Sequence, residues 1–142
     1  MTTTDANKDL IRRMEDAIFN RRDLSAIDRF ISPDYVLRTA PEGVPNGREA
    51  VRDSMAAYLD GFPDLHVAVE QLLAEGDRVV AVLSYSGTHG GDLFGMPATG
   101  KRISVRQIAV YRIDGGRVVE EWEVSDQLGL MQQLGAIPAE AS

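Results

Sequence analysis

Residues 103–126 read ISVRQIAVYRIDGGRVVEEWEVSD, and this stretch decides the fold class. Two runs rich in β-branched and aromatic residues, 103–113 and 117–126, flank Asp114-Gly115-Gly116. A two-residue turn at Gly115-Gly116 suits a tight hairpin, because glycine has no Cβ to oppose positive backbone φ angles. The stretch therefore predicts a long antiparallel hairpin.

A second hairpin and several helices are expected on either side of it. Residues 65–74 and 78–88 are rich in strand-forming residues and flank the turn Glu75-Gly76-Asp77. A short strand is expected at 35–39. Apolar residues recur at helical spacing in four segments, which are 10–18, 24–31, 51–62 and 128–134.

Helices segregated from antiparallel strands predict an α+β fold. We expect one domain spanning residues 1–142, with its core over 7–138 and a frayed tail at 139–142. Three N-terminal helices would pack on a strongly curved antiparallel sheet and leave an apolar pocket between the sheet and the third helix. Apolar residues on the outer face, such as Ile108 and Val110, predict a homodimer or homotetramer that buries this face.

The composition argues against several classes of function. The chain has 142 residues, a formal net charge of −7, two histidines and no cysteine. An acidic domain lacks the positively charged surface that binds nucleic acid or an anionic membrane. Without cysteine, the chain can form no disulfide and has no cysteine nucleophile. Two histidines without cysteine argue against a catalytic zinc site, and no glycine-rich nucleotide motif occurs. We therefore expect a cytoplasmic protein that uses no metal or other cofactor.

Several motifs, taken together, resemble one family. They are Gly87-Thr88-His89, FGMPATGK at 94–101, YRIDGGRVVEEW at 111–122, Asp126, and LGLMQQLG at 128–135. They are similar to motifs of the SnoaL-like polyketide cyclases, which have the cone-shaped, NTF2-like fold of nuclear transport factor 2 and ketosteroid isomerase. The resemblance implies ring closure of a polyketide ester by an intramolecular aldol condensation without cofactor or metal. It also places Asp126 where that family has its acid/base aspartate.

Alternation along the last strand offers a physical reason for this role. Strict alternation would turn Trp122, Val124 and Asp126 toward the pocket, and Glu121 and Glu123 away from it. Burial beside Trp122 would raise the pKa of Asp126, which suits a base that removes a proton next to a carbonyl. Alternatively, Asp126 caps the C-terminal helix, since aspartate is common at helix N-caps.

Other candidate ligand contacts come from the remaining segments. Gln107, expected opposite Val124, could hold a carbonyl or enolate oxygen, or bond to a neighbouring backbone group. His89 could overhang the pocket mouth and donate to an oxyanion, or it could anchor its loop. Arg38 could bind a substrate carboxylate or ester oxygen, or pair with Asp126 or a glutamate. The side chains expected to pack against flat rings are Tyr58, Phe62, Met96 and Trp122.

Three functions are compatible with these residues. The first is a polyketide cyclase or related isomerase or lyase, in which Asp126 is the base and His89 or Gln107 stabilises the enolate. The second is a non-catalytic module that binds a small apolar or polyketide-like ligand. The third is an accessory of a hydroxylase or hydrolase, with the same pocket and different partners.

Overall fold

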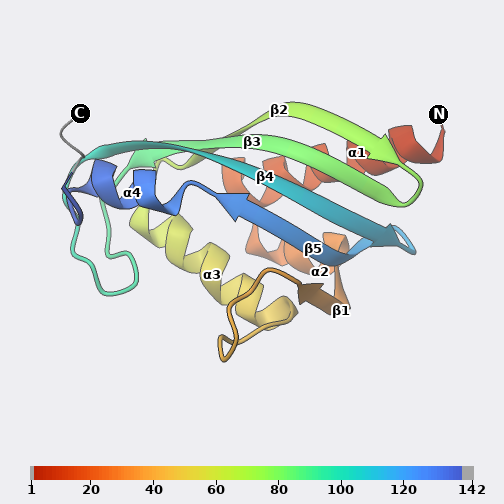
Figure 1. The fold of residues 1–142 in the computed structure, drawn as a ribbon, viewed down its shortest axis with the longest axis horizontal. Coiled ribbons are helices and arrows are strands. Elements are labelled where there is room, and N and C mark those ends of the chain that lie inside the picture. Colours follow the sequence, from red (N-terminus) through yellow and green to blue (C-terminus); the bar gives the residue numbers. More distant parts are fainter. Residues whose placement is uncertain (1, 139–142) are drawn as a thin grey trace.

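The computed structural model describes residues 2–138, so the tail expected at 139–142 lies outside the described residues. Within them the chain forms four α-helices, one π-helix, one 3-10 helix and five strands (Figure 1). In chain order they are α1 (Thr3–Glu15), a π-helix (Asp16–Asn20), a 3-10 helix (Leu24–Ala26), α2 (Ile27–Phe30), β1 (Ile31–Leu37), α3 (Arg48–Gly61), β2 (His66–Glu75), β3 (Arg78–Thr88), β4 (Arg102–Asp114), β5 (Arg117–Ser125) and α4 (Gln127–Leu134).

The five strands form one sheet in the order β1-β5-β4-β3-β2. The two expected hairpins, β2–β3 and β4–β5, are antiparallel, as is the β3–β4 pair. However, β1 pairs parallel with β5. The α+β class is therefore confirmed, but the expectation of a purely antiparallel sheet is wrong. The strong curvature expected for the sheet stays a prediction.

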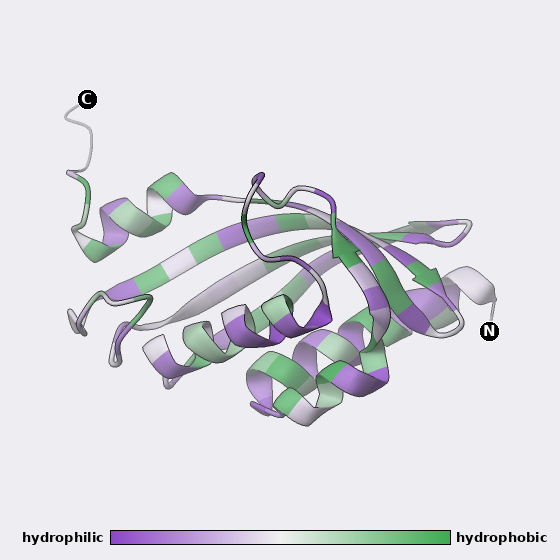
Figure 2. Ribbon diagram, turned by 90° about the horizontal axis from the view of Figure 1, so that it is seen from below, coloured by the Kyte–Doolittle hydropathy of each residue, from purple (hydrophilic) through white to green (hydrophobic). Residues whose placement is uncertain are grey.

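The helices α1, α2 and α3 lie on one side of the sheet (Figures 1 and 2). The buried apolar side chains of the helices and the sheet form one hydrophobic core. Helical spacing aligns Ile11, Met14 and Ile18 into one buried stripe along α1 and the π-helix that follows it. On β3, the alternate residues Val79, Ala81 and Leu83 are equally buried. The buried stripe of the helix and the buried row of the strand thus pack against the same core.

A bulge in β5 decides which of its side chains face the helices. The turn is the expected one, because Gly115 and Gly116 have φ angles of 60° and 76°, and Ile113 pairs with Val118. The next pair is Arg112 with Glu120, which leaves one extra residue in β5.

From that point the predicted register is wrong by one residue. Ala109 pairs with Glu123 instead of Trp122, and Gln107 pairs with Ser125 instead of Val124. Since side chains alternate between the two faces, the shift exchanges the inward and outward rows of β5. Glu121 and Glu123, expected to point away from the pocket, therefore lie on its side of the sheet.

The loop between β3 and β4 is docked on the end of α3. The backbone N–H groups of Gly90 and Gly91 both donate to the Gly61 carbonyl oxygen at 3.1 Å. A Cβ at position 91 would lie 2.1 Å from the Asp60 carbonyl oxygen, so this close approach requires glycine. Among the described residues, no helix combines the length and apolar character needed to cross a membrane.

Candidate functional site

A cavity of about 550 Å³ lies between the inner face of the sheet and the helices α1 and α3. Its volume is in the range of pockets that bind small molecules. The lining is mainly apolar, with aromatic rings from several elements, namely Phe19, Tyr35, Tyr58, Phe62, Tyr85, Phe94 and Tyr111. The apolar pocket expected between the third helix and the sheet is therefore present.

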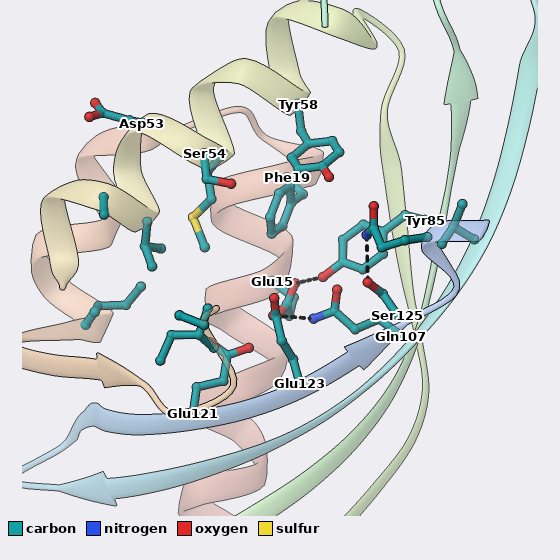
Figure 3. A pocket seen from close by; sticks show the side chains of 18 of the residues that line it. Glu15, Phe19, Asp53, Ser54, Tyr58, Tyr85, Gln107, Glu121, Glu123 and Ser125 are labelled. Carbon is teal, nitrogen blue, oxygen red and sulfur yellow. Dashed lines mark hydrogen bonds between the residues drawn. The ribbon is translucent and has the colours of Figure 1, made fainter. Parts of the chain in front are cut away.

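Three glutamates from two elements converge on this cavity (Figure 3). Glu121 and Glu123 come from β5, where the bulge has turned them inward, and Glu15 is the last residue of α1. The Gln107 side-chain amide of β4 donates to Glu123 Oε2 at 3.1 Å. The Tyr35 hydroxyl of β1 donates to Glu121 Oε1 at 2.7 Å, so the parallel strand pairing supplies a partner for this carboxyl.

Burial affects the acidity of Glu121 and Glu15. It raises the pKa of Glu121 well above its usual range, and the adjacent Glu123 carboxyl raises it further. Burial also raises the pKa of Glu15 to about 7, against the opposing effect of hydrogen bonds from Tyr111 and Tyr85. Burial therefore favours the protonated form of Glu121, and at neutral pH the Glu15 carboxyl is near its titration midpoint.

The cavity brings together three of the side chains expected to contact a ligand. Gln107, Tyr58 and Phe62 all line it. The Tyr58 ring meets Phe94 edge to face, with ring centroids 5.5 Å apart. Phe94 is 67% exposed, so this aromatic pair marks the solvent side of the cavity.

Trp122 and Arg38 lie on the other side of the sheet from the cavity. The guanidinium carbon of Arg78 lies 5.0 Å from the centroid of the Trp122 ring. Arg38 Nε lies 2.6 Å from Glu120 Oε2, so Arg38 pairs with a glutamate, one of the two roles considered for it. The expectation that Trp122 lines the pocket is wrong, because the β5 bulge reverses its direction.

Asp126 is the N-cap of α4. Its Oδ1 accepts a hydrogen bond from the Gly129 backbone N–H at 2.8 Å, and its side chain is not part of the cavity lining. The expectation that its carboxylate points into the pocket is wrong. Asp126 instead has the helix-capping role that the sequence left open as the alternative. The physical reason is local, since an N-cap oxygen satisfies a backbone donor that the first turn of a helix leaves free.

His89 is fully buried at the base of the loop between β3 and β4, and it does not line the cavity. Its Nδ1 accepts from the Thr99 backbone N–H at 3.3 Å and lies 3.0 Å from the Thr99 hydroxyl. Met96 also lies outside the lining, where its backbone pairs with that of Leu93. His89 therefore has the loop-anchoring role considered as its alternative and does not overhang the pocket mouth, and the expected position of Met96 on the pocket wall is wrong.

The sequence reasoning missed the glutamates of the cavity, although one of them left a signal. Glu15 lies four residues after Ile11 and three before Ile18, so helical spacing alone places it on the buried stripe of α1. A carboxyl inside an apolar stripe is a reason to look for a site. Glu121 and Glu123 left no comparable signal, because their direction depends on the bulge. No three His, Cys, Asp or Glu residues within 2–138 are grouped so that they could hold a metal ion.

The chain matches the SnoaL-like polyketide cyclase family over residues 8–134 and belongs to that family. It is 35% identical over 130 residues to the aklanonic acid methyl ester cyclase DnrD of Streptomyces peucetius, with 89% of each chain covered. It is 31% identical over 120 residues to the nogalonic acid methyl ester cyclase of Streptomyces nogalater, covering 82% of this chain and 89% of that relative.

Solved structures share the fold over nearly the whole chain. TsrD from Streptomyces laurentii superposes with a TM-score of 0.85 at 29% identity, covering 96% of this chain and 100% of TsrD. AclR from Streptomyces galilaeus gives a TM-score of 0.86 at 33% identity, covering 99% of this chain and 87% of AclR. The arrangement of four helices on a five-stranded mixed sheet is thus that of the SnoaL-like, NTF2-like structures.

Proposed function

We propose that this protein is a cofactor-independent polyketide cyclase in which Glu123 is the general base. The observation that carries the proposal is the position of Glu123, on the inner face of β5, in the wall of an apolar cavity, with Gln107 donating to its carboxyl at 3.1 Å. Two relatives over 30% identical are named as cyclases of aklanonic acid methyl ester and of nogalonic acid methyl ester. We accordingly propose a neutral aromatic keto ester as the substrate.

Among the three glutamates, Glu123 is best suited to be the base. Burial raises the pKa of Glu121 well above its usual range, which favours its protonated form. Glu15 is 2% exposed and already accepts two tyrosine hydroxyls. Glu123 is only half-buried, and its amide partner can stay bonded while the carboxylate accepts a proton.

The reaction balances without an external reactant. The Glu123 carboxylate takes a proton from the carbon next to a substrate carbonyl, and the electron pair of the broken C–H bond forms an enolate. The enolate carbon attacks a second carbonyl carbon of the same molecule, which forms a C–C bond and leaves an alkoxide. The alkoxide takes the proton back from Glu123, so the product is an isomer of the substrate.

The test is to replace Glu123 with glutamine and measure turnover of aklanonic acid methyl ester. Glutamine keeps the size and the amide contact but accepts no proton, so kcat should fall by a factor of about 100 or more. Asp126→Asn is the matched control, since asparagine is as good an N-cap as aspartate and should leave kcat within a few-fold.

The same pair of variants separates the competing hypotheses. Loss of kcat in Asp126→Asn, with Glu123→Gln active, would return the role of base to Asp126. A wild-type protein that binds the ester and converts none of it would favour the non-catalytic binding module. Retention of full activity in both variants would remove both carboxylates as bases.

We also propose that the outer face of the sheet joins two copies of the chain. Ile108 and Val124 are 48% and 75% exposed there, and burial of such apolar side chains favours association. Val124→Glu should weaken the assembly, because a pair of like charges would meet across a two-fold interface. Sedimentation of the wild type as a monomer at micromolar concentration would contradict this proposal.

A further inference from the structure

A buried carboxyl at the inner end of the cavity takes no part in the proton transfer proposed above. Glu15 accepts two hydroxyls, from Tyr111 at 2.9 Å to Oε1 and from Tyr85 at 3.2 Å to Oε2. The three residues come from α1, β4 and β3, and all of them line the cavity. In the close view of the site, Glu15 and Tyr85 lie beside Gln107 and Glu123 (Figure 3).

The fold alone does not call for a glutamate at position 15. The neighbouring residues on the same stripe of α1, Ile11, Met14 and Ile18, are apolar and buried. A methionine or leucine would extend that stripe, whereas a carboxylate buried among neutral hydroxyls loses its hydration without gaining a cation. Glu15 avoids this cost below about pH 7, where its carboxyl is mostly neutral, since burial raises its pKa to about 7.

The protonation state of Glu15 decides where the hydroxyl hydrogen of Tyr85 goes. An ionised Glu15 has only acceptor oxygens, so it holds the hydrogens of Tyr85 and Tyr111 together. A neutral Glu15 has an O–H of its own, which donates to one tyrosine oxygen and releases the hydrogen of that tyrosine. Tyr85 makes the longer bond and is half-buried, while Tyr111 is 3% exposed, so Tyr85 is the one that can turn its hydrogen into the cavity.

The ring of Tyr85 is held in place while its hydroxyl changes partner. Phe19 meets it edge to face, with ring centroids 5.3 Å apart and an interplanar angle of 76°. Tyr85 therefore presents a fixed donor atom to any ligand that fills the cavity. A donor held in position before the reaction stabilises developing charge without a reorganisation cost.

We propose that Tyr85, with neutral Glu15 behind it, donates a hydrogen bond to the ligand oxygen on which negative charge develops when Glu123 removes a proton. The proposal rests on the proposed function and adds the class of ligand group that this end of the cavity takes, a neutral ketone or phenol oxygen. Tyr85 contacts the ligand and is a catalytic residue, whereas Glu15 acts through it and is a positioning residue. No covalent bond forms or breaks at either side chain.

The proposal implies a definite dependence on pH. The titratable groups that face Glu15 are Tyr85 on β3, Tyr111 on β4, and Glu121 and Glu123 on β5. As the pH rises through about 7, Glu15 ionises, recaptures the Tyr85 hydrogen and adds a negative charge to the cavity. Binding of a ligand oxygen should therefore weaken over this interval.

The test uses 2-naphthol, a neutral aromatic phenol that contains no ketone and needs no turnover, and measures its Kd by fluorescence titration. Tyr85→Phe keeps the ring and its contact with Phe19, so below pH 7 its Kd should rise about three- to tenfold, the loss expected for one hydrogen bond. Ser84→Ala is the matched control, because it removes a hydroxyl from the adjacent position of β3, one bonded to Glu70 rather than to the cavity.

The role of Glu15 is tested by the pH profile of the same Kd. Wild-type Kd should rise between about pH 6 and about pH 8, and in Glu15→Gln, which has no titrating proton, it should stay flat. Equal Kd values in Tyr85→Phe and Ser84→Ala would overturn the proposal, as would a profile that survives in Glu15→Gln or a wild type that does not bind 2-naphthol. If the naphthol results hold while Glu123→Gln keeps its kcat, the proposed function fails and the assignment of Tyr85 as the oxygen-binding donor stands.

Discussion

Glu120 and Glu121 are neighbours on β5, and their carboxyls lie in opposite environments. Glu120, on the outer face, pairs with Arg38 at 2.6 Å and also with Arg112, and hydrogen bonds from these two guanidinium groups lower its pKa. Glu121, on the inner face, is 7% exposed, bonds to the Tyr35 hydroxyl, and has a raised pKa because of its burial. One step along the strand thus separates a glutamate whose ionised form is stabilised from one whose neutral form is favoured.

The difference shows that side-chain direction, and not residue type, gives each face its chemistry. On the outer face, the Glu120 carboxylate pairs with guanidinium groups that stay in contact with water. These ion pairs are therefore screened and contribute little to the free energy of unfolding. On the inner face, the carboxyls form hydrogen bonds with neutral tyrosine hydroxyls and with the amide of Gln107. Their protonation states therefore depend on burial. On the inner face, the Glu15 carboxyl can gain and lose a proton near neutral pH.

The largest expected effect concerns the pH dependence of stability on the inner face. The pKa of Glu15 is raised from 4.5 to about 7 by folding, so the folded state binds its proton more tightly than the unfolded state does. This stabilisation is complete below pH 4.5 and is lost as the pH rises through about 7, a loss of about 3 kcal/mol in the free energy of unfolding. Urea unfolding of the wild type and of Glu15→Gln over this interval measures it.

Glu15→Gln should remove that part of the pH dependence and leave the part due to Glu121, which has the same sign. Parallel curves of unfolding free energy against pH for the wild type and Glu15→Gln would contradict the assignment. The inner face would then not differ from the outer face in the way described.

The next effect concerns Asp126, which belongs to neither face. Asp126→Ala removes the N-cap of α4 and should lower the free energy of unfolding by about 1 kcal/mol. Asp126→Asn is the matched control and should change it by only a few tenths of that value, because asparagine caps equally well. A large loss in Asp126→Asn would mean that the charge of Asp126, and not its capping oxygen, matters for folding.

A smaller effect is expected from Arg78, whose guanidinium carbon lies 5.0 Å from the centre of the Trp122 ring on the outer face. Arg78→Gln should lower the free energy of unfolding by about 0.5 kcal/mol, the usual value for an exposed cation–π contact. Trp122 is the only tryptophan in the chain, so its fluorescence reports this contact directly. A cavity ligand that shields Trp122 from a water-soluble quencher would contradict its outward direction.

The smallest effect should come from Glu120 itself. Glu120→Gln breaks ion pairs with Arg38 and Arg112 that remain partly exposed, so its melting temperature should lie close to that of the wild type. Any difference should disappear in concentrated salt. Its pH dependence has the opposite sign to that of Glu15, since a lowered pKa gives stability that is lost as the pH falls. A destabilisation as large as that at the inner face would break the contrast between the two faces.

Much of the fold was predictable because the signals are local. The Gly115-Gly116 turn, the β2–β3 hairpin and the helix α3 each follow from residues within a few positions of one another. The β1 strand was predicted only in part, because it begins at Ile31, directly after α2, and includes Pro33. Its parallel pairing with β5 joins segments far apart in the chain, which no local pattern encodes.

On the strands, the candidate site was predicted only where alternation is uninterrupted. On β4, which is regular through its middle, Gln107 and Ala109 face inward as expected. On β5 the same counting fails at Val119, because an extra residue in a strand reverses every later direction and leaves no clear trace in composition. Because of this one-residue shift in β5, the candidate base is Glu123 and not Asp126.

The sequence by itself determined the α+β class, the two hairpins, the main helices and membership of the SnoaL-like family, since each depends on local periodicity or on contiguous motifs. Only the tertiary structure decided which carboxyls share the cavity. Glu15 and Glu123 are more than one hundred residues apart in the chain and meet because α1 packs on the inner face of the sheet. The environment of a carboxyl, and therefore its proton affinity, depends on neighbours that long-range packing brings together, and a sequence read position by position does not contain them.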